Sequence, residues 1–106
     1  MIDYKDFSDE ELICRLRAGE SSIEEYLLEK YKPFVKNKSR ALFLVGGDKE
    51  DLIQEGMIGL FKAIRDYNPE NGAPFAAFAK LCVERQIYTA IEAAGRMKNA
   101  PLNAYI

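Results

Sequence analysis

The sequence predicts an all-α fold, a compact bundle of four to six helices within one domain of 106 residues. Three observations lead to this prediction. Apolar residues recur at intervals of three and four along most of the chain, which is the period of an amphipathic helix. Residues that typically begin or end helices stand at the ends of these periodic segments. No segment alternates between apolar and polar residues for long enough to form a strand, and the sequence has no internal repeat.

A short helix of about three turns is expected to begin after Ser8. Ser8 and Glu11 have the spacing of a capping box, in which each side chain accepts a hydrogen bond from the backbone N–H of the other residue. Leu12, Ile13 and Leu16 give this helix an apolar edge. Gly19 is placed to end it in a left-handed backbone conformation, which glycine adopts without a steric penalty.

The next helical element contains a proline, and its part from Lys30 to Arg40 is the most basic stretch of the chain. A second capping box, of Ser21 with Glu24 or of Ser22 with Glu25, is expected to begin this element. Pro33 lacks the N–H that a helix interior needs, so we expect the element to be kinked or broken there.

A third helix is predicted from about residue 49 to residue 67, with Asp48 as its N-cap and with Gly46-Gly47 ending the element before it. Its apolar stripe, suited to face a core, consists of Ile53, Met57, Leu60, Phe61 and Ile64. Its polar stripe, with one apolar member, consists of Asp51, Gln54, Glu55, Ile58 and Lys62. Its glycine stripe consists of Gly56, Gly59 and Ala63. Each glycine costs about 1 kcal/mol relative to alanine, so we expect another helix backbone against the glycine stripe.

Turn residues from Asn68 to Gly72 separate this helix from a last one, predicted from Phe75 to Ala94. Pro74 is placed in its first turn and Gly95 near its end. One side of this helix is a stripe of small and aliphatic residues, namely Ala76, Ala79, Val83, Ile87, Ala90 and Ala94. Because this stripe matches the glycine stripe, we expect residues 49–67 and 75–94 to form a long antiparallel pair.

The other side of the last helix combines aromatic, basic and hydrogen-bonding side chains. We call this set the ribbon, and it consists of Phe78, Leu81, Cys82, Arg85, Tyr88, Thr89, Glu92 and Arg96. Aromatic rings can stack on unpaired bases, and arginine or threonine can reach base edges or phosphates. The ribbon therefore suits capture of a single strand beside a duplex. The alternative is that Phe75 and Phe78 belong only to the core.

The composition argues against several classes of function. The chain has no histidine, which removes the commonest general base and the commonest metal ligand. Cys14 and Cys82 are a distant pair without a CxxC motif, so reduced, buried thiols are expected. Asp51 and Glu55 are one helical turn apart and could act as paired carboxylates, but no nucleophile motif or phosphate-binding loop accompanies them. We therefore expect no enzymatic activity, no metal site and no cofactor.

The formal net charge is −2, but the charge is unevenly distributed. Residues 1–29 carry nine acidic and three basic side chains, residues 30–50 two and six, residues 51–72 four and two, and residues 73–106 two and four. This alternation suggests either separate surfaces for separate partners or solvated helix faces of mixed sign. No apolar run is long enough to span a bilayer and the first residues lack the pattern of an export signal, so we expect a cytoplasmic protein.

Two stretches, DLIQEGMIGLFKAIRDYNPENG and PFAAFAKLCVERQIYTAI, resemble region 2 of the sigma-70 family of bacterial RNA polymerase initiation factors. The resemblance covers most of the chain, from DEELICRLRAGE through KNAPLNAYI, and is closest to the sporulation and stationary-phase type called sigma-H. It implies a single region 2 domain over residues 1–106. Residues 8–47 would match regions 1.2 and 2.1, residues 48–72 region 2.2, and residues 73–100 regions 2.3 and 2.4.

The first partner that the resemblance implies is core RNA polymerase. In the family, the region 2.2 helix binds a coiled coil in the clamp of the largest polymerase subunit. The matching positions are Asp51, Gln54, Glu55, Ile58, Met57, Phe61 and Lys62. This implication agrees with the polar stripe, whose polar groups around an aliphatic residue resemble a protein interface.

The second implied partner is promoter DNA, since the helix that follows captures the non-template strand of the −10 element in the family. The matching or flanking positions are Phe75, Phe78, Lys80, Leu81, Arg85, Tyr88, Thr89 and Glu92. The aromatic pair matches positions that stack or pocket flipped bases, and the lysine would neutralise phosphate. Arg85 and Thr89 match positions that read the upstream edge of the element as duplex.

The chain departs from family members that melt promoters readily. It has Leu81 and Cys82 in place of a tryptophan pair, and Ala73 in place of an aromatic residue. Each stacking surface is worth about 1 to 3 kcal/mol, so we expect weaker melting and a stricter demand for a matching promoter, as in an alternative factor. We expect the chain to be an isolated domain or a truncated product, because no C-terminal domain that reads the −35 element follows Ile106.

The expected function is that of a sigma-factor domain that binds core RNA polymerase and recognises and helps melt the −10 element. The alternative is a protein-interaction domain that binds polymerase or an anti-sigma regulator without useful DNA affinity in isolation. The low net charge favours this alternative for the isolated domain.

Overall fold

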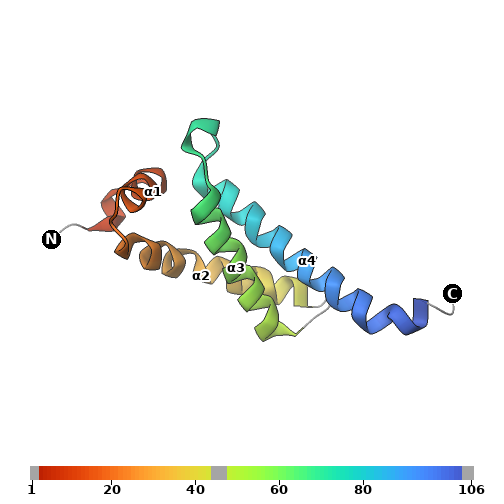
Figure 1. Ribbon diagram of the computed structural model, residues 1–106. Helices are drawn as coiled ribbons and strands as arrows, with labels where there is room; N and C mark the ends of the chain where they lie inside the picture. Colours follow the sequence, from red (N-terminus) through yellow and green to blue (C-terminus); the bar gives the residue numbers. More distant parts are fainter. Residues whose placement is uncertain (1–2, 44–47, 104–106) are drawn as a thin grey trace.

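The computed structural model describes residues 3–43 and 48–103, with the side chains of residues 3–43 and 48–95. This part of the chain is all-helical, as predicted. It consists of α1 (Asp9–Arg17), α2 (Ser22–Phe43), α3 (Lys49–Asp66) and α4 (Phe75–Asn103), with the short 3-10 helices η1 (Tyr4–Asp6) and η2 (Pro69–Asn71). Figure 1 shows the predicted antiparallel pair of α3 and α4, with α2 crossing it and α1 near the N-terminal end of α2.

Local sequence chemistry sets several helix ends. Ser8 Oγ accepts a hydrogen bond from the Glu11 N–H, and Glu11 Oε1 accepts one from the Ser8 N–H, both at 3.1 Å, which confirms the predicted capping box. Gly19, just after α1, has a φ of +119°, as expected for a residue that ends a helix. Asp48 caps α3 by accepting a hydrogen bond from the Glu50 N–H at 2.8 Å.

The start of α2 differs from the expectation, and its middle excludes one of the two alternatives at Pro33. α2 begins at Ser22, so Ser21 stands just before the helix, but within the described residues Ser21 contacts Glu24 only through the backbone and no capping box forms. The Ser22 hydroxyl lies 2.7 Å from Tyr4 Oη instead. The predicted break at Pro33 does not occur, because α2 continues past it. Pro33 and Glu29 are both exposed, so water can satisfy the Glu29 carbonyl that proline leaves without a donor. The predicted end at Gly46-Gly47 lies outside the described residues.

The buried side of α3 is centred on the glycine stripe, not on the predicted apolar stripe. The buried residues are Leu52, Gly56, Gly59, Leu60, Ala63 and Ile64. Three members of the predicted apolar stripe are less buried than expected: Ile53 and Met57 are half-buried, and Phe61 is 43% exposed. Small residues let a neighbouring helix approach most closely, so the side of α3 that carries them turns toward the core.

The two glycines of α3 make room for different neighbours. A Cβ on Gly59 would lie 2.8 Å from the carbonyl oxygen of Cys82 in α4, which confirms the expected contact with another helix backbone. A Cβ on Gly56 would instead meet side-chain carbons of Val35 in α2 at 2.6 Å and of Ile87 in α4 at 3.2 Å. The glycine stripe therefore lies where α2, α3 and α4 come together.

The last helix is longer than predicted. α4 continues through Gly95 to Asn103, so the predicted end near Gly95 is wrong. Gly95 does not have a positive φ, and it stays in the helix at a cost of about 1 kcal/mol relative to alanine. The small-residue stripe of α4 is buried at Ala79, Val83 and Ile87, and its other members are half-buried.

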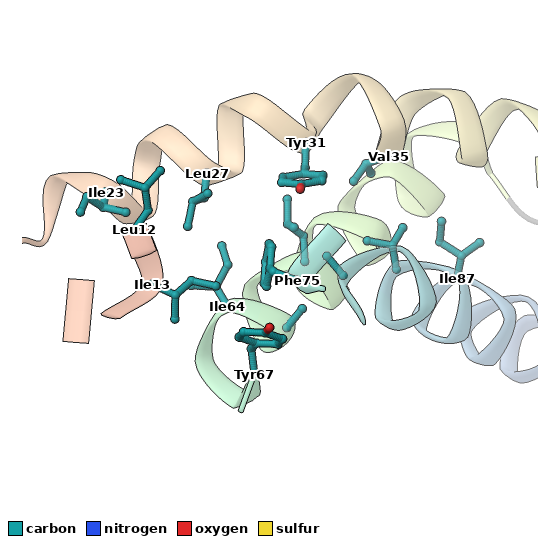
Figure 2. Packing of buried hydrophobic residues seen from close by; sticks show 14 of the residues in the cluster. Leu12, Ile13, Ile23, Leu27, Tyr31, Val35, Ile64, Tyr67, Phe75 and Ile87 are labelled. Carbon is teal, nitrogen blue, oxygen red and sulfur yellow. The ribbon is translucent and has the colours of Figure 1, made fainter. Parts of the chain in front are cut away.

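The core is one cluster that draws side chains from all four α-helices, as Figure 2 shows. Leu12 of α1, Leu27 of α2, Ile64 of α3 and Ile87 of α4 are each at most 3% exposed. Along the described part of the chain, none of the helices combines the length and the apolar character needed to cross a membrane.

Candidate functional site

The polar stripe lies on the outer side of α3. Its members Asp51, Gln54, Ile58 and Lys62 are exposed, and Glu55 is half-buried. Ile58 and the neighbouring Phe61 are each 43% exposed, and Met57 is half-buried. Two large apolar side chains with carboxylate, amide and ammonium groups around them have the composition of a protein interface, with an apolar centre and a polar rim.

Gln86 of α4 belongs to neither face predicted from the sequence, but it holds two side chains of the polar stripe. Its Nε2 donates a hydrogen bond to Glu55 Oε2 at 2.7 Å, and its Oε1 accepts one from Lys62 Nζ at 3.2 Å. Gln86 lies opposite Gly59, whose added Cβ would be 2.9 Å from Gln86 Cβ. Finding Gln86 from the sequence would have required the register of the two helices, which the position of Gly59 indicates but does not fix alone.

A groove of about 210 Å³ runs between α3 and α4 beside Gln86. Lys62 and Asp66 of α3 and Arg85 and Thr89 of α4 are among its lining residues. The Asp66 carboxylate pairs with Arg65 Nε at 2.8 Å, and this hydrogen bond lowers the pKa of Asp66. Because Arg65 balances Asp66, the charge that the groove offers to a partner is positive. The polar stripe and the ribbon meet along this groove.

Most of the ribbon is exposed along the part of α4 whose side chains are described, as expected. Leu81 and Tyr88 are 43% and 47% exposed, and Arg85, Thr89 and Glu92 are exposed as well. Thr89 Oγ1 donates a hydrogen bond to the Arg85 carbonyl oxygen at 2.8 Å, which orients the hydroxyl and leaves its oxygen able to accept another. The side chain of Arg96 lies outside the described residues.

The groove side of the ribbon is partly buried. Phe78 and Cys82 are half-buried, and burial raises the pKa of the Cys82 thiol. Cys82 therefore stays protonated near neutral pH and behaves as a small apolar residue. The expectation that both cysteines are buried is wrong for Cys14, which is exposed.

Phe75 is a core residue and not an exposed stacking surface. Its side chain is 0% exposed, and its ring packs edge to face against Tyr31 at 5.7 Å and Tyr67 at 5.3 Å between ring centroids. A ring without accessible surface cannot stack on a base, so the core alternative is correct for Phe75. The centroid of the Phe78 ring lies 5.7 Å from that of the Tyr67 ring, and Phe78 keeps part of its surface accessible.

Lys80 lies where α4 passes α2. Its Nζ is 5.4 Å from the centroid of the Phe34 ring, and Lys38 Nζ is 5.9 Å from the same ring. Lys38 Nζ also pairs with Glu84 Oε1 at 3.1 Å, whereas Lys80 forms no ion pair in the described part of the chain. Lys80 is exposed, so its ammonium group can meet a phosphate.

Comparison with known proteins gives both a family and individual relatives. Residues 27–97 match the family described as Sigma-70 region 2. The chain is 50% identical over 97 residues to the RNA polymerase sigma-H factor of Bacillus subtilis (strain 168), an alignment that covers 92% of this chain and 44% of that relative. It is 50% identical over 98 residues to the sigma-H factor of Bacillus licheniformis, with the same coverage of 92% and 44%.

A more distant relative shares less of the sequence. The RNA polymerase sigma-E factor of Clostridium acetobutylicum is 32% identical over 79 residues, which cover 74% of this chain and 34% of that factor. The chain thus spans less than half the length of the curated relatives that it matches. The family match extends from α2 into the second half of α4 and includes both the polar stripe and the described part of the ribbon. The chain belongs to the sigma-70 family and contains its region 2.

Proposed function

We propose that this chain acts in bacterial transcription initiation as the part of a sigma factor that binds core RNA polymerase and recognises and helps melt the promoter −10 element. One observation carries this proposal. Two exposed faces of different chemistry, the polar stripe and the ribbon, lie on two helices that the Gly59–Cys82 backbone contact locks together. A rigid pair with two adjoining faces of different chemistry suits a protein that joins an enzyme to DNA.

The polar stripe is the face that we assign to polymerase, with a coiled coil in the clamp of the largest subunit as its partner. Ile58 and Phe61 would supply the apolar centre, and Asp51 and Gln54 the polar rim. Glu55 is held in place by Gln86, so less side-chain entropy is lost when a partner binds it. These roles are predictions that the exposure and the fixed geometry of the stripe support.

The ribbon is the face that we assign to the −10 element. Tyr88 and the accessible part of Phe78 offer rings for stacking on unpaired bases. Lys80 would neutralise a phosphate, while Arg85 and Thr89 can hydrogen-bond to base edges of the upstream duplex. Leu81 offers only an aliphatic surface. This supports the expectation that the chain melts promoter DNA weakly and requires a closely matching −10 element, as in an alternative factor.

The proposed role involves no chemical step by this chain, since catalysis would belong to the polymerase in the cytoplasm. The direct test is retention of the chain by immobilised core RNA polymerase of Bacillus subtilis. A second step fuses a −35-binding domain to the chain and measures promoter-dependent transcripts made by the resulting complex. No retention by core polymerase would overturn the proposal.

A second function, that of a protein-interaction domain alone, is favoured by the net charge of −2. Such a domain would bind polymerase, or an anti-sigma protein, without contributing DNA affinity. The two functions differ in one measurement. The complex with core polymerase should bind a single-stranded −10 oligonucleotide more tightly than core polymerase alone, whereas an interaction-only domain would leave that affinity unchanged.

A further inference from the structure

The short helix α1 contacts both helix ends that flank the loop between α3 and α4. Glu10 Oε2 accepts a hydrogen bond from the backbone N–H of Phe75, the first residue of α4, at 2.6 Å. Arg17 Nη2 donates to the carbonyl oxygens of Tyr67 at 2.5 Å, Arg65 at 3.2 Å and Ile64 at 3.3 Å, at the end of α3. These contacts join residues 47 to 65 positions apart in the sequence.

The two contacts have the signs that helix ends favour. The N-terminus of a helix carries partial positive charge and unpaired N–H groups, and the C-terminus carries partial negative charge and unpaired carbonyls. The carboxylate of Glu10 therefore stabilises the start of α4, and the guanidinium of Arg17 stabilises the end of α3. One helix thus supplies the caps of two others.

The loop itself is also held from within. Tyr67 Oη donates a hydrogen bond to the Ala73 carbonyl oxygen at 2.5 Å, and the Asn68 side chain accepts one from the Glu70 N–H at 3.0 Å. Gly72 has a φ of +78°, which other residues rarely adopt. With internal bonds and external caps, the loop fixes the direction in which α4 starts.

We propose that Glu10 and Arg17 are positioning residues for the promoter-facing side, which set the placement of Phe78, Lys80 and Leu81 by holding the ends of the loop. This inference rests on the proposed function. Neither residue belongs to the ribbon or to the polar stripe, so both act through the backbone of α3 and α4. The polar stripe lies on the N-terminal side of the capped end of α3, so its placement does not depend on these caps.

The test compares Arg17→Ala with Arg15→Ala. Both substitutions remove one positive charge from α1, but Arg15 pairs with Glu20 at 2.8 Å and lies over the Phe7 ring, away from the loop. The probe is a pool of short fluorescent single strands, randomised at the central positions, bound to the complex of the full chain with Bacillus subtilis core polymerase. Arg17→Ala should weaken probe binding about tenfold and polymerase binding by less than about twofold. Arg15→Ala should change neither.

Further variants separate positioning from general stability. Arg17→Lys keeps a donor for the carbonyls and should restore most of the probe affinity, and Glu10→Gln, which keeps an acceptor oxygen, should be milder than Glu10→Ala. Equal losses of probe and polymerase affinity for Arg17→Ala would refute the proposal, since they would report unfolding. Unchanged probe affinity for Arg17→Ala and Glu10→Ala would refute it as well.

Hydrogen exchange tests the same inference without relying on the proposed function. Arg17→Ala should speed amide exchange in residues 67–78 while leaving residues 56–60 of α3 protected, and Arg15→Ala should change neither segment. If the wild-type chain did not bind polymerase, the proposed function would fail while this result still reported on the caps. Wild-type protection of residues 67–78 in Arg17→Ala would overturn the positioning role in either case.

Discussion

Gly59 of α3 lies so close to Cys82 of α4 that an added Cβ would be 2.8 Å from the Cys82 carbonyl oxygen. The obstacle is backbone, which cannot move aside as the end of a flexible side chain can. This contact therefore sets the distance between α3 and α4, and with it the spacing between the polar stripe and the ribbon.

Gly59→Ala should destabilise the protein, because α3 and α4 must separate to admit the methyl group. Overpacking of this kind costs about 1 to 3 kcal/mol, and the better helix propensity of alanine offsets about 1 kcal/mol of it. Thermal unfolding followed by circular dichroism measures the difference. Gly95→Ala is the matched control, since a Cβ there would meet no atom within 4 Å, and it should stabilise the chain. An unchanged or higher melting temperature for Gly59→Ala would contradict the prediction.

Joint replacement of Gln54 and Glu55 by alanine should weaken binding to core polymerase and leave the fold nearly intact. Gln54 is exposed, and Glu55 loses one hydrogen bond to Gln86, a cost of about 1 kcal/mol. Fluorescence anisotropy with core polymerase and a thermal melt give the two readouts. Joint replacement of Asn37 and Glu25 on α2 removes the same two groups elsewhere and should not alter polymerase binding. A large drop in melting temperature would show that Gln54 and Glu55 are structural.

Thr89→Val should change which upstream base of the −10 element is preferred, while overall DNA affinity changes little. Valine keeps the branched shape of threonine but removes the oxygen. Hydrogen bonding to a base edge is then lost, together with the exposed local bond from Thr89 Oγ1 to the Arg85 carbonyl oxygen. Binding of the polymerase complex to promoter fragments varied at single upstream positions measures the preference. The same loss on every fragment would point to a phosphate contact or a structural role.

Phe75→Ala and Phe78→Ala should fail in different ways. Phe75 is fully buried between Tyr31 and Tyr67, so its truncation should cost about 3 to 5 kcal/mol of stability. Phe78 is only half-buried, so its truncation should cost less stability and weaken binding of the single-stranded −10 oligonucleotide. Urea denaturation and oligonucleotide binding by the polymerase complex separate the two effects. A stable Phe75→Ala protein with lost oligonucleotide binding would reverse the assignment of Phe75 to the core.

Stability should fall in alkali partly through Tyr31. Burial and the hydrogen bond that Tyr31 Oη donates to the Asp9 carboxylate raise the pKa of Tyr31 above its ordinary value of 10.0. The fold favours the neutral phenol, so this stabilisation is complete below pH 10 and is lost as the pH rises toward the raised pKa. Urea denaturation on both sides of pH 10 should show a smaller loss of stability for Tyr31→Phe than for wild type. Tyr88→Phe, at an exposed position, should lose as much as wild type. An equal loss in Tyr31→Phe and wild type would exclude this role.

The features that the sequence predicted correctly depend on chemistry within a few residues. Ser8 with Glu11 and Asp48 at the start of α3 are local caps, and the structure contains both. The glycine stripe also predicted the α3–α4 pair, because only a close neighbour offsets the cost of Gly59 within a helix. The glycine stripe and the small-residue stripe indicated which sides of α3 and α4 face each other. The polar stripe and most of the described part of the ribbon were therefore expected to be exposed.

The features that the sequence did not predict depend on contacts between distant residues. Gln86 reaches Glu55 across the helix pair, and Glu10 reaches the amide of Phe75, 65 residues away, so no local pattern marks either contact. The burial of Phe75 has the same origin, because the rings of Tyr31 and Tyr67 come from different parts of the chain. Periodicity also placed Ile53, Met57 and Phe61 on the core side of α3, but these three are half-buried or exposed. The small residues of the glycine stripe are buried instead, beside Leu60 and Ile64.

The division of α4 into a buried and an exposed side has a consequence for how such factors diverge. Val83 and Ile87 are at most 1% exposed and carry the packing, whereas Tyr88 and Thr89 are exposed and contribute little to it. Substitutions at the exposed positions can therefore accumulate without loss of the fold or of the polymerase-facing side. Under the proposed function, one scaffold can give rise to paralogues with different promoter preferences, each altered in a few side chains of the same helix.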